Sequence, residues 1–524
     1  MFSARGATAR AAGLATALVL TLASVGGPGA HRQARQARPG SVLIAPTAFS
    51  TSTPIHHLVV IFQENESFDH YFGLYPHALN PAGEPAFHPA PATPHPNGLT
   101  TALLTRNPNH VNPRRLSRTQ LFPCPNDHSY TGEQQAFDHG QMDRFVHPAG
   151  SSRCRYGSTM DYYDGNTVTA LWNYAQRFSM SDNSHDATYG PTMLGHLNLA
   201  AGQTHGAVVT GGTTGSVVNG TVIGNANAKY EDCGPATGPK VAMSGRNVGD
   251  LLSAARVTWG YFSAGFRPSS RNPDGTPVCH TSHSNLAGHS YRDYIAGAGT
   301  EPFQFWSSTS NPHHLPPKSV AELGNPGQAH HQYDLADFWT AAGAGRMPAV
   351  SFIKAPAYAN SHEGNSDPLD EQQFLVSTIN RIQSLSTWPS TAIVIAYDDS
   401  DGWYDHVMTR PLNSSSDPLR DTLSGPGHCG SGPALGGYLD RCGPGPRQPL
   451  LIISPYSRTN WIDHTLTTQV SITRFVEDNW LRGQRLGGGS FDASAGSLLG
   501  LFSFAHPNST RLILDPRTGL QLRH

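Results

Sequence analysis

Short, uninterrupted apolar runs recur along the chain and predict buried β-strands. The runs cover residues 58–62, 207–210, 257–262, 349–353, 392–396 and 450–453. They do not alternate between polar and apolar residues, and such runs are typical of strands that are covered on both faces of a sheet. We therefore expect these strands to lie in one buried sheet.

Helical patterns lie between the strands. One helix is predicted to begin at Pro368, because Asp367 is a favourable N-cap and proline fits the first turn. Leu375, Ile379, Ile382 and Ser386 are predicted to lie on one face of this helix. A second helix is predicted over residues 468–480, with an apolar side formed by Ile472, Phe475, Val476 and Trp480. Strands that alternate with helices predict an α/β fold with a mainly parallel, doubly wound sheet.

The composition adds long loops to this picture and excludes some partners. The 524 residues include 54 glycines and 41 prolines, which favours long Pro/Gly-rich loops. Lys and Arg number 35 against 37 Asp and Glu, and no basic run follows the N-terminal region, so we expect no binding to nucleic acid. The 27 histidines make the net charge sensitive to pH near 6.5.

Residues 1–30 have the layout of a secretory signal peptide. Arg5 and Arg10 precede the apolar run 11–25, and small residues follow it. The run is shorter than the ~20 residues that cross a bilayer, so we expect no permanent membrane anchor. The sequence therefore predicts a signal peptide at 1–30, a linker at 31–50, a single domain at 51–524, and a secreted or periplasmic protein.

The cysteines agree with an oxidising compartment, because their number, 6, is even. No C-x-x-C motif occurs, so zinc or redox chemistry is not expected at these residues. Other pairings stay open, but the most local choice gives disulfides Cys124–Cys154, Cys429–Cys442 and Cys233–Cys279.

Acidic side chains follow two of the predicted strands. Glu64 and Asn65 come after one apolar run, and Asp398 and Asp399 come after another. Carboxyl ends of parallel strands meet at one edge of a sheet, and adjacent carboxylates are costly there unless a cation or protons neutralise them. The four residues could form an oxygen site for one divalent ion such as Mg, Ca or Mn. The alternative is that they cap turns and helices in solvent.

Thr192 is a candidate nucleophile. Pro191 suits the first turn of a helix, so backbone N–H groups and the positive end of the helix dipole would face an anion beside the hydroxyl. A metal-bound threonine alkoxide at this position could attack phosphorus. The alternative is a threonine that only caps its own helix.

Several ordered motifs resemble one known family. Residues 64–73 read Glu-Asn-Glu-Ser-Phe-Asp-His-Tyr-Phe-Gly, and further matches occur at residues 190–192, 311–314, 366–371 and 397–406. Over residues 55–485 the chain resembles the bacterial phosphoesterase family that contains secreted acid phosphatases and phosphatidylcholine-type phospholipases C. A long signature followed by ordered shorter motifs is a specific match.

The resemblance implies an alkaline-phosphatase-like fold and one catalytic domain with one divalent metal ion, whose identity the motifs do not fix. Position by position, it makes Thr192 both a metal ligand and the nucleophile. The other implied metal ligands are Glu64, Asn65, Asp398 and Asp399. The histidines that surround the phosphoryl group in this family correspond to His128, His313, His314 and His362.

The implied chemistry is hydrolysis of a phosphoric ester through a phosphothreonine intermediate. Several cationic histidines would favour an acidic pH optimum. Many phospholipase-type members carry Asn-Pro-Asn after the nucleophile, where this chain has Met193-Leu194-Gly195. We therefore expect an acid phosphatase or broad phosphomonoesterase that acts on small phosphorylated substrates. The alternatives are a phospholipase C that cleaves phosphatidylcholine-type headgroups and an inactive extracellular binding protein on the same fold, and the oligomeric state stays open.

Overall fold

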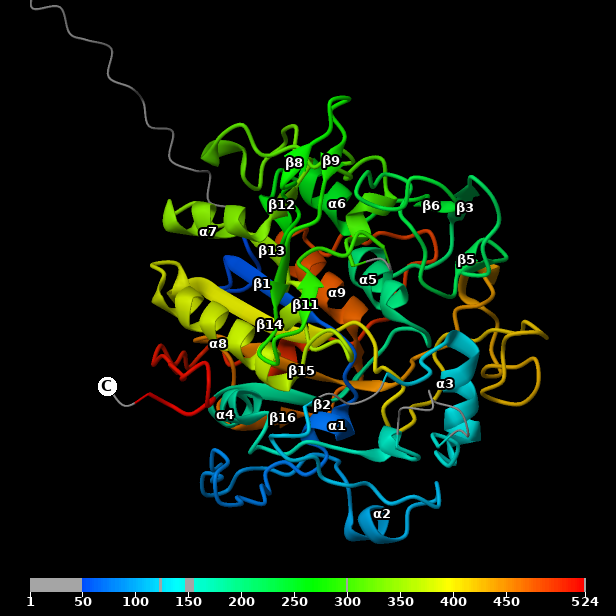
Figure 1. Cartoon of the computed structure of the whole chain (residues 1–524), viewed down its shortest axis with the longest axis vertical. Coiled ribbons are helices and arrows are strands. Elements are labelled where there is room, and N and C mark those ends of the chain that lie inside the picture. Colours follow the sequence, from blue (N-terminus) through cyan, green and yellow to red (C-terminus); the bar gives the residue numbers. More distant parts are fainter. Residues whose placement is uncertain (1–49, 122–124, 147–154, 298–299, 523–524) are drawn as a thin grey trace, which may run out of the picture. The chain divides into compact units, whose positions relative to one another are not determined.

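A computed structural model describes residues 50–121, 125–146, 155–297 and 300–522 (Figure 1). Its centre is a nine-stranded sheet. The strand order is β12 (Gln332–Asp334), β7 (Trp259–Ser263), β13 (Val350–Lys354), β1 (His57–Gln63), β14 (Thr391–Tyr397), β15 (Arg447–Ile453), β2 (Ser179–His185) and β16 (Trp461–Asp463), with β17 (Thr467–Thr468) also paired to β2. Only β15 is antiparallel to its neighbours in this sheet. The predicted mainly parallel α/β sheet is therefore confirmed.

Helices cover both faces of the sheet, on opposite sides in Figure 1. Leu58, Val60 and Phe62 of β1 face one core, while Val59 and Ile61 face the other. The first core is covered by α5 (Thr192–Ala201), α6 (Val248–Ala254) and α9 (Gln469–Trp480). The second is covered by α1 (Phe68–Phe72), α4 (Thr169–Arg177), α7 (Leu335–Gly343) and α8 (Pro368–Ser384). Both faces of the sheet are buried, so its strands can carry apolar side chains at successive positions. This agrees with the two-sided burial that the apolar runs predict.

The remaining elements lie in loops. They are the helices α2 (Thr101–Thr105) and α3 (Tyr130–Phe137), and the paired short strands β3 (Ala207–Thr210) with β6 (Lys240–Met243), β4 (Val217–Val218) with β5 (Thr221–Val222), β8 (Ser270–Arg271) with β9 (Pro277–Val278), and β10 (Ser282–Ser284) with β11 (Ser290–Arg292). The strand expected at 207–210 forms, but its place in the central sheet was predicted wrongly. It pairs only with β6 and leaves Val208 52% exposed, because a four-residue apolar run can also form a surface hairpin.

The local signals for two helices are confirmed. The Asp367 side chain accepts hydrogen bonds from the backbone N–H groups of Leu369 and Asp370 at the start of α8. Helix α9 begins at Gln469, directly after Thr468.

None of the helices in the described ranges is long and apolar enough to span a membrane.

Two of the predicted disulfides are present, Cys233–Cys279 and Cys429–Cys442. Cys124 and Cys154 lie outside the described residues, as do the predicted signal peptide and most of the predicted linker. The second disulfide lies in the loop that connects β14 to β15. The same loop holds α3 in place, because Asp421 accepts a hydrogen bond from the Tyr130 hydroxyl at 2.7 Å.

This loop also contains a carboxylate that makes folding sensitive to pH. Burial, together with Asp417 and Asp421, raises the pKa of Asp440 to about 7. The folded protein therefore holds a proton that the unfolded chain has lost between about pH 4 and 7, so its stability should fall as the pH rises through this range. Asp440→Asn keeps a residue that tolerates the local φ of 64° and should gain about 1–2 kcal/mol at pH 8 but not at pH 4. Urea unfolding at both pH values checks this, and equal effects at both would contradict it.

Candidate functional site

The two acidic clusters meet at the carboxyl ends of neighbouring strands. Gln63, the last residue of β1, is in register with Tyr397, the last residue of β14. Glu64 and Asn65 therefore lie beside Asp398, and the Asn65 N–H donates a hydrogen bond to Asp398 Oδ1 at 3.2 Å. All three side chains are buried. The arrangement is the one that a parallel pairing of the two strands predicts.

Thr192 lies beside these carboxylates as the first residue of α5. Its hydroxyl donates a hydrogen bond to Asp399 Oδ2 at 3.2 Å. Pro191 occupies the N-cap position, so the helix begins where the sequence predicts. The N–H of Met193 donates to the Asn225 side chain at 3.0 Å, which leaves fewer N–H groups of the first turn for an anion than expected.

Gly195 allows α5 to approach this part of the site. A Cβ atom at this position would lie 1.9 Å from the carbonyl oxygen of Asp398. No real Cβ contact is that short, so the backbone at Asp398 or the helix itself would have to move. A glycine here therefore fixes the distance between the helix that carries Thr192 and the strand that carries the carboxylates.

Gly195→Ala is expected to be harmful, because the clash of the new Cβ atom should outweigh the higher helix propensity of alanine. Alanine favours a helix by about 1 kcal/mol over glycine, yet we expect a net loss of stability and a loss of roughly 10²-fold in the ester hydrolysis that the sequence predicts, because displacement by about 1 Å has effects of that order. Thermal unfolding and steady-state assays measure both. Gly343→Ala in α7, where a Cβ would meet no atom within 4 Å, is the matched control, and equal behaviour of the two variants would contradict the prediction.

The site contains two residues that the sequence analysis missed, His196 and Lys354. His196 Nε2 lies 3.2 Å from Asp398 Oδ2, and Lys354 Nζ lies 2.6 Å from Glu64 Oε1. His196 stands four positions after Thr192, so helical spacing could have indicated it. Lys354 ends β13, and its position could have been indicated by the same strand-end argument that selected Glu64. Burial and the nearby Lys354 charge hold the pKa of His196 well below its usual value, so the imidazole is neutral.

These side chains could hold a metal ion. Ligand atoms of Glu64, His196 and Asp398 lie within 4.8 Å of one another. Asn65 Oδ1 is buried without a hydrogen-bond partner, and Asp398 Oδ2 and His196 Nε2, although 3.2 Å apart, form no well-aligned hydrogen bond. Buried polar atoms without a partner are costly, and a cation among them would remove that cost. The donor set therefore fits the divalent ion that the motifs imply, with His196 as an additional nitrogen donor.

His128 and His362 interact electrostatically with the carboxylates of the site. His128 Nδ1 is 3.3 Å from Asp401 Oδ1, and His362 Nδ1 bonds to the Glu363 carbonyl at 2.8 Å. Burial lowers the pKa of His128, but Asp399 and Asp401 outweigh it and raise the value to about 10. His128 is therefore a cation at the site at neutral pH.

The structure does not bring His313 and His314 into contact with these residues. His313 is exposed and bonds to Asp232 at 2.6 Å. His314 is buried, with one ring nitrogen bonded to Glu231 and the other to the Phe266 carbonyl, both at 2.7 Å. Both nitrogens of His314 are thus engaged elsewhere, and a catalytic role for either histidine stays a prediction.

Glu133 connects the segments that carry the site. Its two carboxylate oxygens accept hydrogen bonds from the Gly190 N–H at 2.8 Å and from the Ser400 hydroxyl at 2.9 Å. Glu133 belongs to α3, so this helix links the turn before Thr192 to the loop after Asp399. The contact aligns the proposed nucleophile with the acidic loop.

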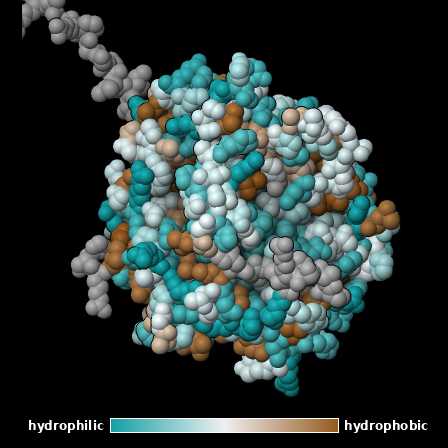
Figure 2. Space-filling view, in the orientation of Figure 1, coloured by the Kyte–Doolittle hydropathy of each residue, from teal (hydrophilic) through white to brown (hydrophobic). Residues whose placement is uncertain are grey.

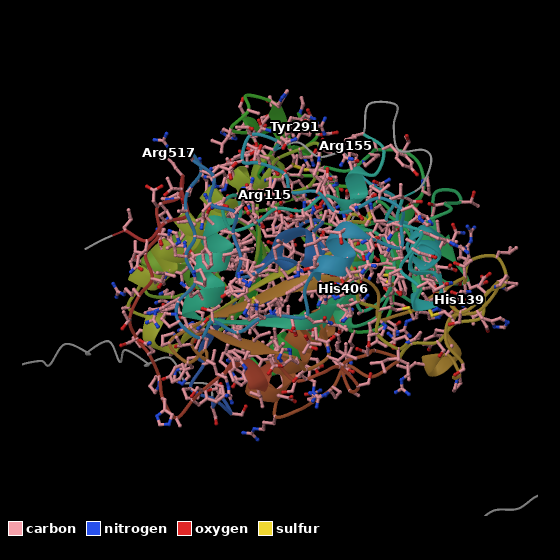
Figure 3. All side chains as sticks on the ribbon, turned by 90° about the horizontal axis from the view of Figure 1, so that it is seen from below. Arg115, His139, Arg155, Tyr291, His406 and Arg517 are labelled. Carbon is pink, nitrogen blue, oxygen red and sulfur yellow. A yellow bond between two sulfur atoms is a disulfide. The ribbon has the colours of Figure 1, made fainter. Side chains whose placement is uncertain are left out.

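A second group of motif residues forms a buried ion network. Arg447 lies between Asp69 and Asp405, at 3.0 and 3.1 Å, and its side chain is fully buried. His406 bonds to Asp69 at 2.6 Å and is seen beside the blue segment that carries α1 in Figure 3. The Arg447 charge thus lies between the two carboxylates and compensates their negative charge.

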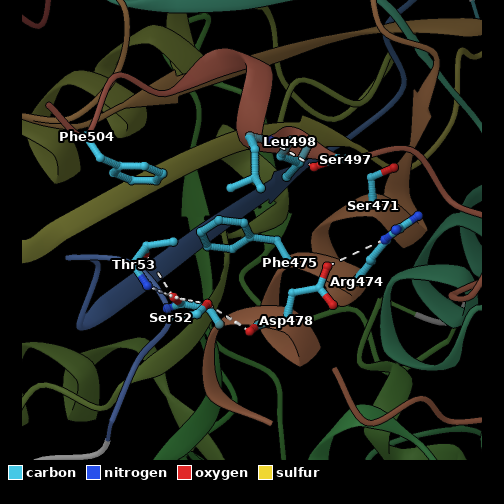
Figure 4. A pocket seen from close by; sticks show the side chains of 11 residues that line it. Ser52, Thr53, Ser471, Arg474, Phe475, Asp478, Ser497, Leu498 and Phe504 are labelled. Carbon is cyan, nitrogen blue, oxygen red and sulfur yellow. Dashed lines mark hydrogen bonds and ion pairs between the residues drawn. The ribbon is translucent and has the colours of Figure 1, made fainter. Parts of the chain in front are cut away.

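A pocket of 330 Å³ lies elsewhere on the molecule (Figure 4). It is lined partly by Ser52, Thr53 and α9 residues including Phe475. Ser52 and Thr53 precede β1, whose other end carries Glu64. The pocket is therefore separate from the acidic site.

On the face shown in Figure 2, hydrophobic residues form small patches among hydrophilic ones.

Comparison with known proteins agrees with the motifs. The non-hemolytic phospholipase C of Pseudomonas aeruginosa is 24% identical over 479 residues, which are 87% of this chain and 58% of that protein. A non-hemolytic phospholipase C of Burkholderia pseudomallei is 26% identical, over 88% of this chain and 60% of that protein. Phospholipase C A of Mycobacterium tuberculosis is 25% identical, over 88% and 79%. The chain thus spans less than two thirds of the length of the first two relatives.

A family model extends the similarity over most of the chain. The model of the Phosphoesterase family matches residues 55–481. This range begins just before β1 and ends just after α9, so it contains the whole central sheet and the acidic site. The chain belongs to the Phosphoesterase family.

Proposed function

We propose that the protein hydrolyses phosphoric esters with Thr192 as its nucleophile. The observation that supports this most directly is the hydrogen bond from the Thr192 hydroxyl to Asp399, beside a buried donor set for a cation. A hydroxyl, an adjacent carboxylate and a cation site are the groups that phosphoryl transfer requires for attack and for stabilising charge.

The reaction would proceed in two displacements. Thr192 Oγ1 would attack phosphorus and pass its proton to Asp399, the carboxylate to which it is hydrogen-bonded, while the bond from phosphorus to the leaving oxygen breaks. His128, a cation beside the site, would donate a proton to the departing alkoxide. Water would then attack phosphorus and give a proton to His128, the bond from phosphorus to Thr192 Oγ1 would break, Asp399 would return its proton to Thr192, and the phosphate product would leave.

Glu64, Asn65, His196 and Asp398 would hold the divalent ion, together with Asp399 and Thr192 as the family resemblance implies. The bound ion would supply positive charge for the threonine oxygen and the phosphoryl group. An imidazole among carboxylates suits transition ions such as Mn or Zn as well as the harder ions.

The substrate we favour is a phospholipid-type phosphodiester, because the similar proteins are named phospholipases C. An acid phosphatase is the second candidate, since the cationic His128 suits a phosphomonoester, which carries more negative charge than a diester. The third candidate is an inactive binding protein on the same fold. In each case, a signal peptide at residues 1–30 would export the protein.

Hydrolysis of 4-nitrophenyl phosphate and of 4-nitrophenyl phosphorylcholine by the same purified protein separates these readings. A higher kcat/KM for the phosphorylcholine ester is expected. Preference for the monoester, with its maximum below pH 6.5, would support the acid phosphatase instead. If neither ester is hydrolysed with Mg, Ca, Mn or Zn at any pH from 4 to 9, the inactive binding protein is the correct reading.

A further inference from the structure

Lys354 is a buried cation placed directly against the proposed metal ligands. It is the last residue of β13, the strand next to β1, and its side chain is 3% exposed. Its Nζ atom lies 2.6 Å from Glu64 Oε1 and 3.7 Å from Asp398 Oδ2. Among the described residues, no other lysine or arginine forms an ion pair with either carboxylate.

The two carboxylates and Lys354 depend on one another. Buried carboxylates without a counter-charge are costly, and so is a buried ammonium without a partner. In the protein without a bound ion, the Lys354 ammonium is the positive charge that lies against both Glu64 and Asp398. Removing this charge would leave the site with unbalanced negative charge.

A divalent ion would compete with Lys354 for the same carboxylates. Glu64 and Asp398, which Lys354 contacts, are two of the three residues whose ligand atoms lie within 4.8 Å of one another. Two cations that share one pair of carboxylates repel each other, and each weakens the binding of the other. The ammonium is tethered to β13, so it can withdraw only by changing its side-chain conformation.

We propose that Lys354 is a positioning residue that preorganises Glu64 and Asp398 when no metal is bound and makes metal binding weaker and reversible. The proposal rests on the proposed function, because it assumes that this donor set binds a divalent ion. Lys354 would thus lower the metal affinity of the site without being a metal ligand.

The test compares Lys354→Met, which keeps the length of the side chain without its charge, with Lys354→Arg. After treatment with a chelator, each protein is titrated with Mn²⁺ by calorimetry and melted with and without saturating Mn²⁺. Lys354→Met should bind Mn²⁺ at least tenfold more tightly than the wild type. Its melting temperature should fall without metal and return close to that of the metal-bound wild type when Mn²⁺ is added, whereas Lys354→Arg should keep an affinity near that of the wild type.

Opposite results identify which idea fails. If the wild type hydrolyses phosphate esters and binds Mn²⁺, but Lys354→Met binds it no more tightly, only the role of Lys354 is overturned. A variant that stays destabilised or unfolded even with Mn²⁺ also overturns it, because a purely structural lysine would behave in this way. If the wild type binds none of Mn²⁺, Ca²⁺ or Zn²⁺, the proposed metal site fails as well, and this role of Lys354 fails with it.

Discussion

Replacing Thr192 by alanine is expected to lower kcat on a nitrophenyl phosphate ester by about 10³-fold or more. The hydroxyl is the group that would form the phosphothreonine bond, and the loss of a nucleophile leaves only the background that binding and charge stabilisation provide. Thr192 is 2% exposed and packs at the start of α5, but alanine keeps its Cβ, so the fold should survive. Steady-state kinetics with a parallel thermal melt check both points.

Thr192→Ser is the matched control, because it restores the hydroxyl that donates to Asp399. It should recover most of the activity that alanine loses. Thr192→Ala with more than a tenth of the wild-type kcat and an unchanged melting temperature would show that another group attacks phosphorus. Direct attack by water would then be the alternative mechanism.

Replacing Arg447 by methionine is expected to destabilise the folded protein by about 3–5 kcal/mol. Arg447 is fully buried between Asp69 and Asp405, and the loss of one partner leaves buried charges without compensation. Its guanidinium also lies 4.2 Å from the centre of the Phe68 ring, so packing is lost together with charge. Urea unfolding at neutral pH measures the change.

Arg144→Met provides the control for this variant. Arg144 also pairs with a carboxylate, Asp138 at 3.0 Å, but its side chain is 60% exposed. An exposed pair contributes only about 0–1 kcal/mol, so this variant should unfold close to the wild type. Equal destabilisation by both substitutions would mean that the burial of the Arg447 network adds nothing to stability.

The part of the site formed by Glu64, Asn65 and Asp398 could be predicted because it depends on strand ends alone. Glu64 and Asn65 are the first two residues after β1 and Asp398 is the first after β14, and parallel strands bring such positions to one edge. The contact with Lys354 depends further on β13 lying next to β1, and strand order is not encoded in any one apolar run. The role of the adjacent histidines at 313 and 314 was inferred from a motif match alone, which gives no information on their contacts, such as that of His314 with Glu231.

The fold was predictable to a similar extent. The apolar runs identified most strands of the sheet, but β2 has the sequence SMSDNSH and escaped because its polar side chains are buried among hydrogen-bond partners. The direction of β15 could not be inferred from its composition. The lack of a predicted helix between β14 and β15 nevertheless favours an antiparallel β15, because a parallel connection needs a crossover, usually a helix, to the other end of the sheet.

The position of Ser52 and Thr53 has a practical consequence for attaching the protein to a surface. Both residues bond to Asn479 at the end of α9 and lead into the amino end of β1, while Glu64 follows the opposite end. The seven residues of β1 span roughly 20 Å at about 3.3 Å per residue. A support or fusion partner joined to the chain just before Ser50 would therefore be linked at the far edge of the sheet, and immobilised protein would present the acidic site toward the solution.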